Sequence, residues 1–288
     1  MRVMEKLSIR QLKKEDIEFA YEMTTKEEWN VTKGDIGRMF GYEPNGSFIA
    51  EANGSRAGHV FAVNYGKLGW IGLLIVGAEY RKKGAGTLLM KRTIDYLLNC
   101  GVQTIDLDAV PEISDLYRRL GFTDKFDSLR YRGTCAKIIL DRNNSAIRME
   151  KEDLVEVAEF DARYFGADRT KVLISLYQAH PRLCFAFHAG SDVAGYVMCR
   201  RAESGYYLGP FVSNSEHVAG QLLAKCLDRL ALNAPIYIGV PAVNEEAGHV
   251  LRGFGFKQYS KSIRMRFGKD LETERQSGIY AIGGPMKG

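Results

Sequence analysis

The chain has 288 residues, 45% of them hydrophobic and 26% charged, which is enough for two domains that each bury a core. Its net charge of +5 is spread along the sequence, which argues against nucleic acid as the main partner. The longest apolar stretch, residues 70–78, is too short to cross a bilayer, and residues 1–6 lack the apolar segment of a signal peptide. Five scattered cysteines without metal-ligand spacing favour a reducing cytoplasm and no bound metal.

The first informative element is an apolar strand predicted over residues 70–76, followed by a turn with basic residues at 81–83 and glycines at 84 and 86. A helix comes next, because apolar residues recur at helical spacing over residues 88–98. Glycines let the backbone approach a ligand closely, and the first turn of a helix has N–H groups without intrahelical partners. The helix dipole favours an anion there. The pattern predicts a phosphate-binding loop, although a Gly-x-Gly pair alone also fits an ordinary turn.

The wider pattern runs from Leu74 and Val76 through Arg81 to Gly84 and Gly86. It is too short for a Walker loop and lacks the third glycine of the dinucleotide fingerprint. It resembles the acyl-coenzyme A pyrophosphate loop of the GNAT superfamily of N-acetyltransferases. The resemblance implies that the loop binds the pyrophosphate of acetyl-CoA, while the strand binds the pantetheine and polarises the thioester carbonyl through its backbone. The residues expected to bind the cofactor are Leu74, Ile75, Val76, Arg81, Lys82, Lys83, Gly84, Ala85, Gly86 and Thr87.

A second segment supports the resemblance. An alternating strand is predicted over residues 102–109, and residues 116–122 then resemble the superfamily's Leu-Tyr-x-x-Leu-Gly-Phe segment. In that family the tyrosine protonates the departing thiolate, which a phenol can do because its pKa lies above that of a thiol. The resemblance therefore assigns Tyr117 the role of general acid; a core tyrosine is the alternative. Many family members have Asn where this chain has Val110, so the cofactor must bind without that amide.

The acceptor side is less defined by sequence. An amine must lose a proton before it attacks, so a general base or a water chain is expected. Glu22, Glu28 and Asp35 lie in the predicted helical region where the family builds its acceptor pocket, but each is more simply a solvated carboxylate. Trp29 and Asn30 resemble a pair in a tandem subgroup of the family, and an aromatic ring beside an amide suits acceptor recognition. A half-buried tryptophan is the simpler account.

The chain resembles a degenerate repeat. Residues 47–58 match residues 184–195 at an offset of 137, and residues 119–122 match residues 253–256 at an offset of 134. We therefore expect a three-residue loss in or near the phosphate loop, and a second copy that keeps the fold but does not bind coenzyme A. At the offset of 134, Arg81 corresponds to Ser215, Lys82 to Glu216, Gly84 to Val218, Gly86 to Gly220 and Tyr117 to Leu251.

The predicted fold class is α/β (α+β), with two tandem GNAT-like domains, each a mixed, mostly antiparallel sheet flanked by helices. A strand predicted over residues 136–140 and a polar segment after it place the boundary at 140/141. Residues 1–140 would form the catalytic domain. Residues 141–288 would form a degenerate domain that serves as a wall of the acceptor pocket, or alternatively as a homodimer surface. Residues 278–285 are predicted to form a strand that completes the second sheet.

The expected activity is direct transfer of an acetyl group from acetyl-CoA to a primary amine of a small molecule. One alternative is a non-catalytic acyl-CoA sensor, which the unidentified base and the missing Asn keep open. Another is protein N-acetylation, which needs an open groove. The expected partner is a small amine acceptor, with neither nucleic acid nor a membrane involved.

Overall fold

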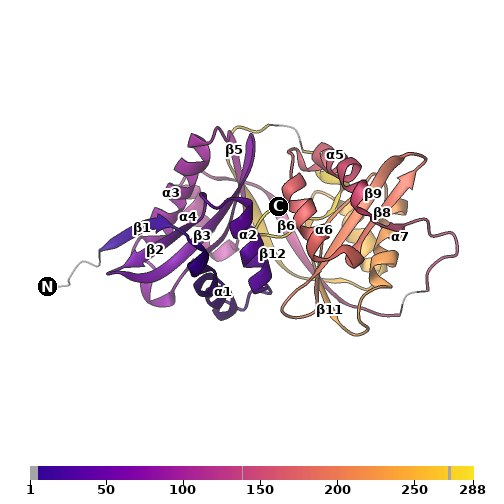
Figure 1. Cartoon of the computed structure of the whole chain (residues 1–288), viewed down its shortest axis with the longest axis horizontal. Helices are drawn as coiled ribbons and strands as arrows, with labels where there is room; N and C mark the ends of the chain where they lie inside the picture. The colour runs from indigo at the N-terminus through magenta and orange to yellow at the C-terminus, as the bar shows by residue number, and fades with distance from the viewer. Residues whose placement is uncertain (1–5, 138, 272–273) are drawn as a thin grey trace.

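The computed structural model describes residues 6–137, 139–271 and 274–288. Both halves of the chain follow one plan: a strand, two helices, three strands, a helix, a strand, a short helix and a long strand (Figure 1). The first half contains β1 (Leu7–Gln11), α1 (Ile17–Lys26), α2 (Lys33–Tyr42), β2 (Phe48–Ala52), β3 (Ser55–Tyr65), β4 (Leu68–Val76), α3 (Ala85–Asn99), β5 (Thr104–Ala109), α4 (Ser114–Arg119) and β6 (Thr123–Thr134).

The second half repeats the plan and adds a short strand, β13. Its elements are β7 (Ile147–Arg148), α5 (Leu154–Phe165), α6 (Thr170–Ala179), β8 (Cys184–Ala189), β9 (Asp192–Arg201), β10 (Tyr206–Ser213), α7 (Glu216–Leu227), β11 (Pro235–Pro241), α8 (Glu245–Gly253), β12 (Lys257–Gly268) and β13 (Ile279–Ala281). The predicted fold class and its repeat are confirmed. The strand predicted over residues 136–140 is wrong: β6 ends at Thr134, and residues 136, 137, 139 and 140 form no strand, while residue 138 lies outside the described residues.

The strands of the described residues form one sheet in the order β1-β2-β3-β4-β5-β12-β6-β11-β10-β9-β8-β7. The two halves exchange their long final strands. β12 of the second half lies antiparallel between β5 and β6, and β6 of the first half continues the sheet to β11. The halves are therefore joined by hydrogen-bonded strands across the middle of the molecule, and not by a linker (Figure 1).

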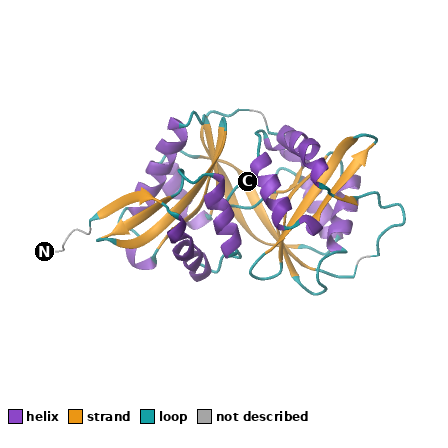
Figure 2. Cartoon of the chain, in the orientation of Figure 1, coloured by secondary structure: helices purple, strands orange, loops and turns teal. Residues whose placement is uncertain are grey.

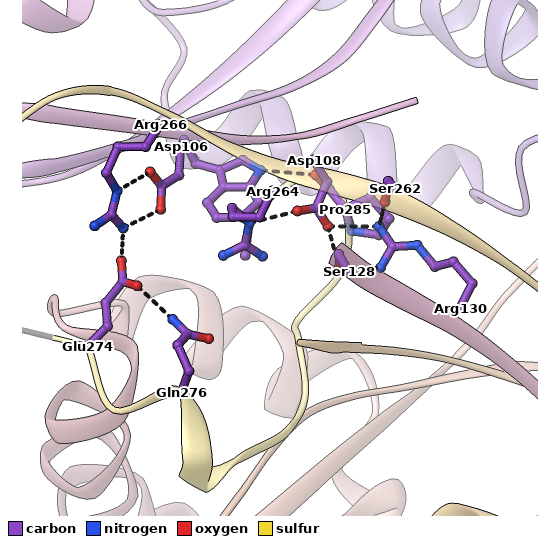
Figure 3. A network of polar contacts seen from close by, with 12 residues as sticks. Asp106, Asp108, Ser128, Arg130, Ser262, Arg264, Arg266, Glu274, Gln276 and Pro285 are labelled. Atoms are coloured by element: carbon purple, nitrogen blue, oxygen red, sulfur yellow. Dashed lines mark hydrogen bonds and ion pairs between the residues drawn. The ribbon is translucent and has the colours of Figure 1, made fainter. Parts of the chain in front are cut away.

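Buried ion pairs fix this strand exchange (Figure 3). Asp106 on β5 pairs with Arg266 on β12 at 2.7 Å. Asp108, two residues further on, pairs with Arg264 on β12 and Arg130 on β6, each at 2.7 Å. Burial would raise the pKa of Asp108, but the two guanidinium groups lower it below its usual value. A buried carboxylate needs such partners. The two aspartates of β5 therefore favour β12 as the next strand of the sheet and β6 as the one after it.

Helices cover both faces of the sheet (Figure 2). α3 packs on one face of the first half and α7 on the second half, each over its own apolar core. On the other face one core joins α1 and α2 to α5 and α6, with buried residues such as Ile36, Trp70 and Leu173 in the same cluster. This shared core brings the second half against the helices that precede the first hairpin. No helix among the described residues is long and apolar enough to cross a bilayer.

Candidate active site

The first half contains a V-shaped opening between two parallel strands. Residues 68–70 of β4 pair with residues 104–106 of β5, and beyond them the strands diverge. A bulge at Leu73 and Leu74, opposite Val60 of β3, bends β4 here, and Leu73 has a φ of +53°. The predicted pantetheine-binding residues Leu74, Ile75 and Val76 lie on the diverging part of β4. The bulge was not predicted, although a glycine next to it, Gly72, is a sequence signal for one.

The predicted phosphate loop lies at the end of this opening. The loop spans residues 77–84, and residues 81–84 are exposed. Gly84 has a φ of +94°, and no atom lies within 4 Å of the position that a Cβ would occupy there. α3 begins at Ala85 without a side-chain N-cap. The backbone N–H groups at its start, with Gly86 and Thr87 in the first turn, are therefore available to an anion, as at other helix N-termini that bind phosphates.

The basic residues of the loop differ in their placement. Arg81 donates from Nε to the carbonyl oxygen of Val76 at 2.9 Å and forms an ion pair with Glu27 at the end of α1. Its side chain thus holds the loop against β4 and α1. Lys82 has a φ of +61° and is exposed, and the ammonium of Lys83 lies 5.8 Å from the centre of the Tyr80 ring. An anion at this loop would therefore meet mainly backbone N–H groups, and Lys82 is the basic side chain that remains exposed beside them.

Tyr117 lies on α4, next to this opening. A Cβ at Gly86 would lie 3.7 Å from the side chain of Val76 and 3.8 Å from that of Leu116, so the loop, β4 and α4 converge here. Tyr117 is 5% exposed and its ring packs edge-on against Phe122. Burial raises the pKa of its phenol, which keeps the hydroxyl protonated. Tyr117 is therefore a core residue whose hydroxyl is protonated at neutral pH.

The corresponding opening in the second half is filled by the chain itself. Residues 206–208 of β10 pair with residues 236–238 of β11, and the strands then diverge as in the first half. β13 enters this space and pairs with β10, with Val212 opposite Ile279. On its other side, the N–H of Ile282 donates to the carbonyl oxygen of Gly239. The predicted closing strand is confirmed for Ile279–Ala281, and its place is inside the second opening.

The second half also lacks the loop. Eight residues separate β4 from α3, but only Asn214 and Ser215 separate β10 from α7. The Ser215 side chain caps α7 by accepting from the N–H of Val218. The expected pairing of Arg81 with Ser215 is therefore wrong: Ser215 takes the place of Gly84, and the rest of the loop is missing. The loop itself is therefore shorter by more than the expected three residues. Extra residues in the second copy, between α7 and the match at residues 253–256, make up part of this difference.

The three candidate bases lie in different surroundings. Glu22 and Glu28 are exposed. Asp35 is 2% exposed and accepts hydrogen bonds from Arg38 and from Arg200 of β9, at 2.7 and 2.9 Å. Burial would raise the pKa of Asp35, but the neighbouring cations lower it well below its usual range. A carboxylate held ionised in this way is a poor proton acceptor, so Asp35 has a structural role.

Trp29 and Asn30 lie where α1 meets the second half. Trp29 is half-buried against the shared core. The Asn30 amide donates to the carbonyl oxygen of Ser204 at 3.0 Å and accepts from its N–H at 2.8 Å. This reciprocal pair ties the α1–α2 loop to the β9–β10 turn. Asn30 therefore positions the second half beside the α1–α2 loop, whatever it contacts in an acceptor.

Two features beside the opening were not found from sequence. His59 on β3 is fully buried next to the bulge, 6.3 Å from the ring centre of Phe19 and 5.5 Å from that of Phe61. Neither ring nitrogen makes a hydrogen bond of good geometry among the described residues. Burial lowers the pKa of His59 to about 4, although backbone groups of Leu73 and Ala20 beside the ring oppose part of this shift. A single histidine in an apolar strand gave no signal, because its importance comes from the bulge on the next strand.

The second feature is the segment after β13. Residues 284–288 lie against β3 and β4: the Trp70 indole on β4 donates to the carbonyl oxygen of Pro285 at 3.0 Å, and the Tyr65 hydroxyl on β3 to that of Lys287 at 2.7 Å. A Cβ at Gly72 would lie 2.4 Å from the Met286 carbonyl oxygen, so glycine is required for this approach. The same segment that fills the second opening thus reaches the strand that lines the first.

Comparisons with known proteins agree with this architecture. A model of the GNAT acetyltransferase family matches residues 8–122, and a model of a GNAT acetyltransferase domain matches residues 157–281, so that together they cover most of the chain. The chain is a tandem GNAT protein. It is an acyl-CoA-dependent N-acyltransferase of that superfamily. Among the described residues, no group of three or more His, Cys, Asp and Glu side chains could hold a metal ion.

Relatives of this tandem GNAT protein match it over nearly its whole length. A holothin acyltransferase from Pseudoalteromonas sp. (strain SANK 73390) is 26% identical over 93% of the chain and 90% of the relative. A protein of Pyrococcus horikoshii assigned as an acetyltransferase has a TM-score of 0.82 and 25% identity, covering 98% of this chain and 96% of that one. A tandem GNAT protein from the clavulanic acid biosynthesis pathway has a TM-score of 0.62 at 14% identity, covering 91% and 98%, and shares the fold.

Proposed function

We propose that residues 1–140 form the catalytic domain and transfer an acetyl group from acetyl-CoA to a primary amine of a small molecule. The observation that carries the proposal is the contrast between the two openings. The first has a diverging strand pair, an uncapped helix N-terminus and a buried phenol, whereas the second is filled and capped. The empty space beside Gly84 fits a pyrophosphate, because no side chain competes for it.

Each part of the first opening has a role in this proposal. Acetyl-CoA supplies a thioester whose carbonyl carbon an amine can attack. The N–H groups of Ala85, Gly86 and Thr87 and the ammonium of Lys82 hold the pyrophosphate. The backbone of β4 at the bulge holds the pantetheine and donates to the carbonyl oxygen as charge develops there. The Tyr117 hydroxyl holds a proton and gives it to the sulfur as the carbon–sulfur bond breaks. The nitrogen loses its proton to solvent as the amide forms, and the Tyr117 phenolate takes a proton back from solvent before the next turnover.

The second domain, residues 141–288, is proposed as the wall of the acceptor pocket. The shared core and the Asn30–Ser204 hydrogen bonds support this, because they hold the second half over the α1–α2 loop. A covered pocket favours a small acceptor over a protein terminus. The names of two similar proteins, a holothin acyltransferase and a protein of the clavulanic acid pathway, also refer to small molecules. Trp29 would line this pocket from the α1–α2 loop.

The test is a screen of amines with acetyl-CoA, in which the released thiol is measured. We expect thiol release with small primary amines and no transfer to peptide N-termini presented at the same concentration. Calorimetry should show one coenzyme A per chain. Coenzyme A binding without transfer to any amine would instead support a non-catalytic acyl-CoA sensor, and transfer to peptides alone would support protein N-acetylation.

A further inference from the structure

A buried group of cations lies where α2 of the first half meets β9 and the segment after β13 of the second half. It consists of Arg38 on α2, Arg200 on β9 and Lys287, arranged around Asp35. Arg200 is 1% exposed and Lys287 is 2% exposed. With one carboxylate against three basic groups, the cluster has more positive charge than it neutralises. Since a buried charge is costly without a partner, this excess needs an explanation.

The single carboxylate of the cluster cannot satisfy the remaining donors. One oxygen of Asp35 accepts from Arg38 and Arg200, and the other accepts from the backbone N–H and the hydroxyl of Thr32. Each carboxylate oxygen has about two acceptor positions, so all four are used. Asp35 is therefore saturated as a hydrogen-bond acceptor.

Two basic side chains of the cluster, Arg200 and Lys287, point to the same place beside Gly284. Nη1 of Arg200 is buried and has no hydrogen-bond partner among the described residues. Nζ of Lys287 lies on the same side of Gly284 as the Arg200 guanidinium: a Cβ at Gly284 would be 3.6 Å from Nζ and 3.5 Å from Nη2. Burial, reinforced by the charge of Arg200, lowers the pKa of Lys287 well below its usual value. An anion between these donors would satisfy both.

The cluster lies close to the proposed site of transfer. Met286, the residue before Lys287, contacts β4 at Gly72, immediately before the bulge at Leu73. Consecutive Cα atoms are about 3.8 Å apart, so Lys287 is one residue step from the strand that lines the first opening. An acceptor whose amine lies at the bulge is expected to direct its other end toward this cluster.

We propose that Arg200 and Lys287 bind an anionic group, such as a carboxylate, of the amine acceptor, so that this tandem GNAT protein selects amino-acid-like acceptors. The inference rests on the proposed function and specifies its substrate class. The β13 segment, anchored in the second opening, carries Lys287 to the first. The second domain thus contributes two specificity-determining side chains, from β9 and from the segment after β13.

The first experiment uses ω-amino acids from glycine to 6-aminohexanoate and the n-alkylamines of matching length, each with acetyl-CoA and thiol detection. We expect the acids to exceed the alkylamines in kcat/KM, with an optimum at one chain length. Lys287→Met should lower the ratio of acid to alkylamine by roughly 10- to 100-fold, the range for a hydrogen bond to a charged group. Lys287→Arg should restore part of it, and Lys91→Met, at an exposed position of α3, should leave the ratio unchanged.

A second measurement separates this inference from the proposed function. If no amine is acetylated, the proposed function fails, and the anion site is then tested by thermal unfolding with acetate, chloride or phosphate at constant ionic strength. Stabilisation of wild type by acetate, absent in Lys287→Met, would support the site. Equal stabilisation by chloride and phosphate would assign it to a free inorganic anion and overturn the acceptor role. Equal kcat/KM for acids and alkylamines, or an unchanged ratio in a folded Lys287→Met, would also overturn it.

Discussion

The two openings of this tandem GNAT protein are built on the same strands and differ in three places. The first has an eight-residue loop, an uncapped helix and a space between diverging strands; the second has a two-residue connection, a serine cap and β13 in that space. All three differences have the same result: the second opening has fewer unsatisfied backbone groups that a ligand could bind. The second opening thus satisfies its own backbone groups, and under the proposed function this, and not only the change of side chains, leaves no ligand site there.

The filling of the second opening also has a consequence for the first. β13 pairs with β10, and the residues after it lie against Trp70 and Gly72 of β4. The strand that fills the second opening thus anchors a segment beside the first. The two openings differ in the groups that they offer to a ligand. Each half of the chain nevertheless depends on strands or segments that the other half supplies.

The largest effect is expected from separating the two copies. A chain ending at Leu140 lacks β12, so the edges of β5 and β6 are exposed and Asp106 and Asp108 lose their partners on that strand. Breaking a buried ion pair costs about 3–5 kcal/mol, and two are broken here. We expect this fragment to be unfolded or aggregated by circular dichroism and size-exclusion chromatography. A folded monomeric fragment that binds coenzyme A would show that the strand exchange is dispensable.

The next effect tests the chemical difference between Tyr117 and its counterpart Leu251. Tyr117→Phe removes the proton for the leaving thiolate and should reduce kcat by roughly 10²–10⁴-fold. Coenzyme A affinity should stay near that of wild type, because the ring remains in its core position against Phe122. Single-turnover kinetics and calorimetry measure the two quantities. Full activity, with chemistry shown to be rate-limiting, would make water the acid.

A smaller effect is expected at the two helix N-termini. Gly84→Val places a β-branched side chain at a φ of +94° and in the space expected for the pyrophosphate. Strain of this kind costs about 1–3 kcal/mol, and the loop can relieve it only by leaving the conformation that binds the pyrophosphate. Coenzyme A affinity should therefore fall by on the order of 100-fold once the steric conflict is included. Ser215→Ala, the matched change in the second half, should leave binding unchanged. Calorimetry that finds equal losses for the two variants would contradict the assignment of the site.

These comparisons also explain what the sequence could and could not predict. The loop before α3 and Tyr117 were predictable because contiguous residues form them. The strand exchange was not, because pairing of β12 with β5 depends on residues more than 150 positions apart, such as Arg266 and Asp106. The predicted correspondence of Arg81 with Ser215 failed for a related reason: a constant offset cannot represent the loss of a whole loop.

The smallest effect concerns a buried position that differs between the copies. His59 on β3 and Tyr196 on β9 occupy equivalent register positions, opposite Ile49 and Ala186 on the preceding strands. The Tyr196 hydroxyl donates to Asp161, which also pairs with Arg169. His59 has no side-chain partner of this kind among the described residues, and only backbone groups of Leu73 and Ala20, outside good hydrogen-bond geometry, lie beside its ring. The copy with the open site thus keeps an unsatisfied buried group beside its bulge, and the filled copy does not.

This difference predicts an acid sensitivity that comes from the first copy. The pKa of His59 is about 4 in the folded protein and 6.5 in the unfolded chain, so as the pH falls the unfolded state takes up the proton first. Stability is therefore lost between about pH 6.5 and 4, and the His59 contribution from pH 7 to pH 5 is about 2 kcal/mol. In urea unfolding at these two pH values, His59→Leu should remove this part of the loss, because leucine has no proton to bind. His249→Leu, at a side chain that is 73% exposed, is the control and should retain the loss. If His59→Leu keeps the whole pH dependence, His59 is either protonated in the folded protein or hydrogen-bonded within it, and the unsatisfied group beside the bulge does not exist.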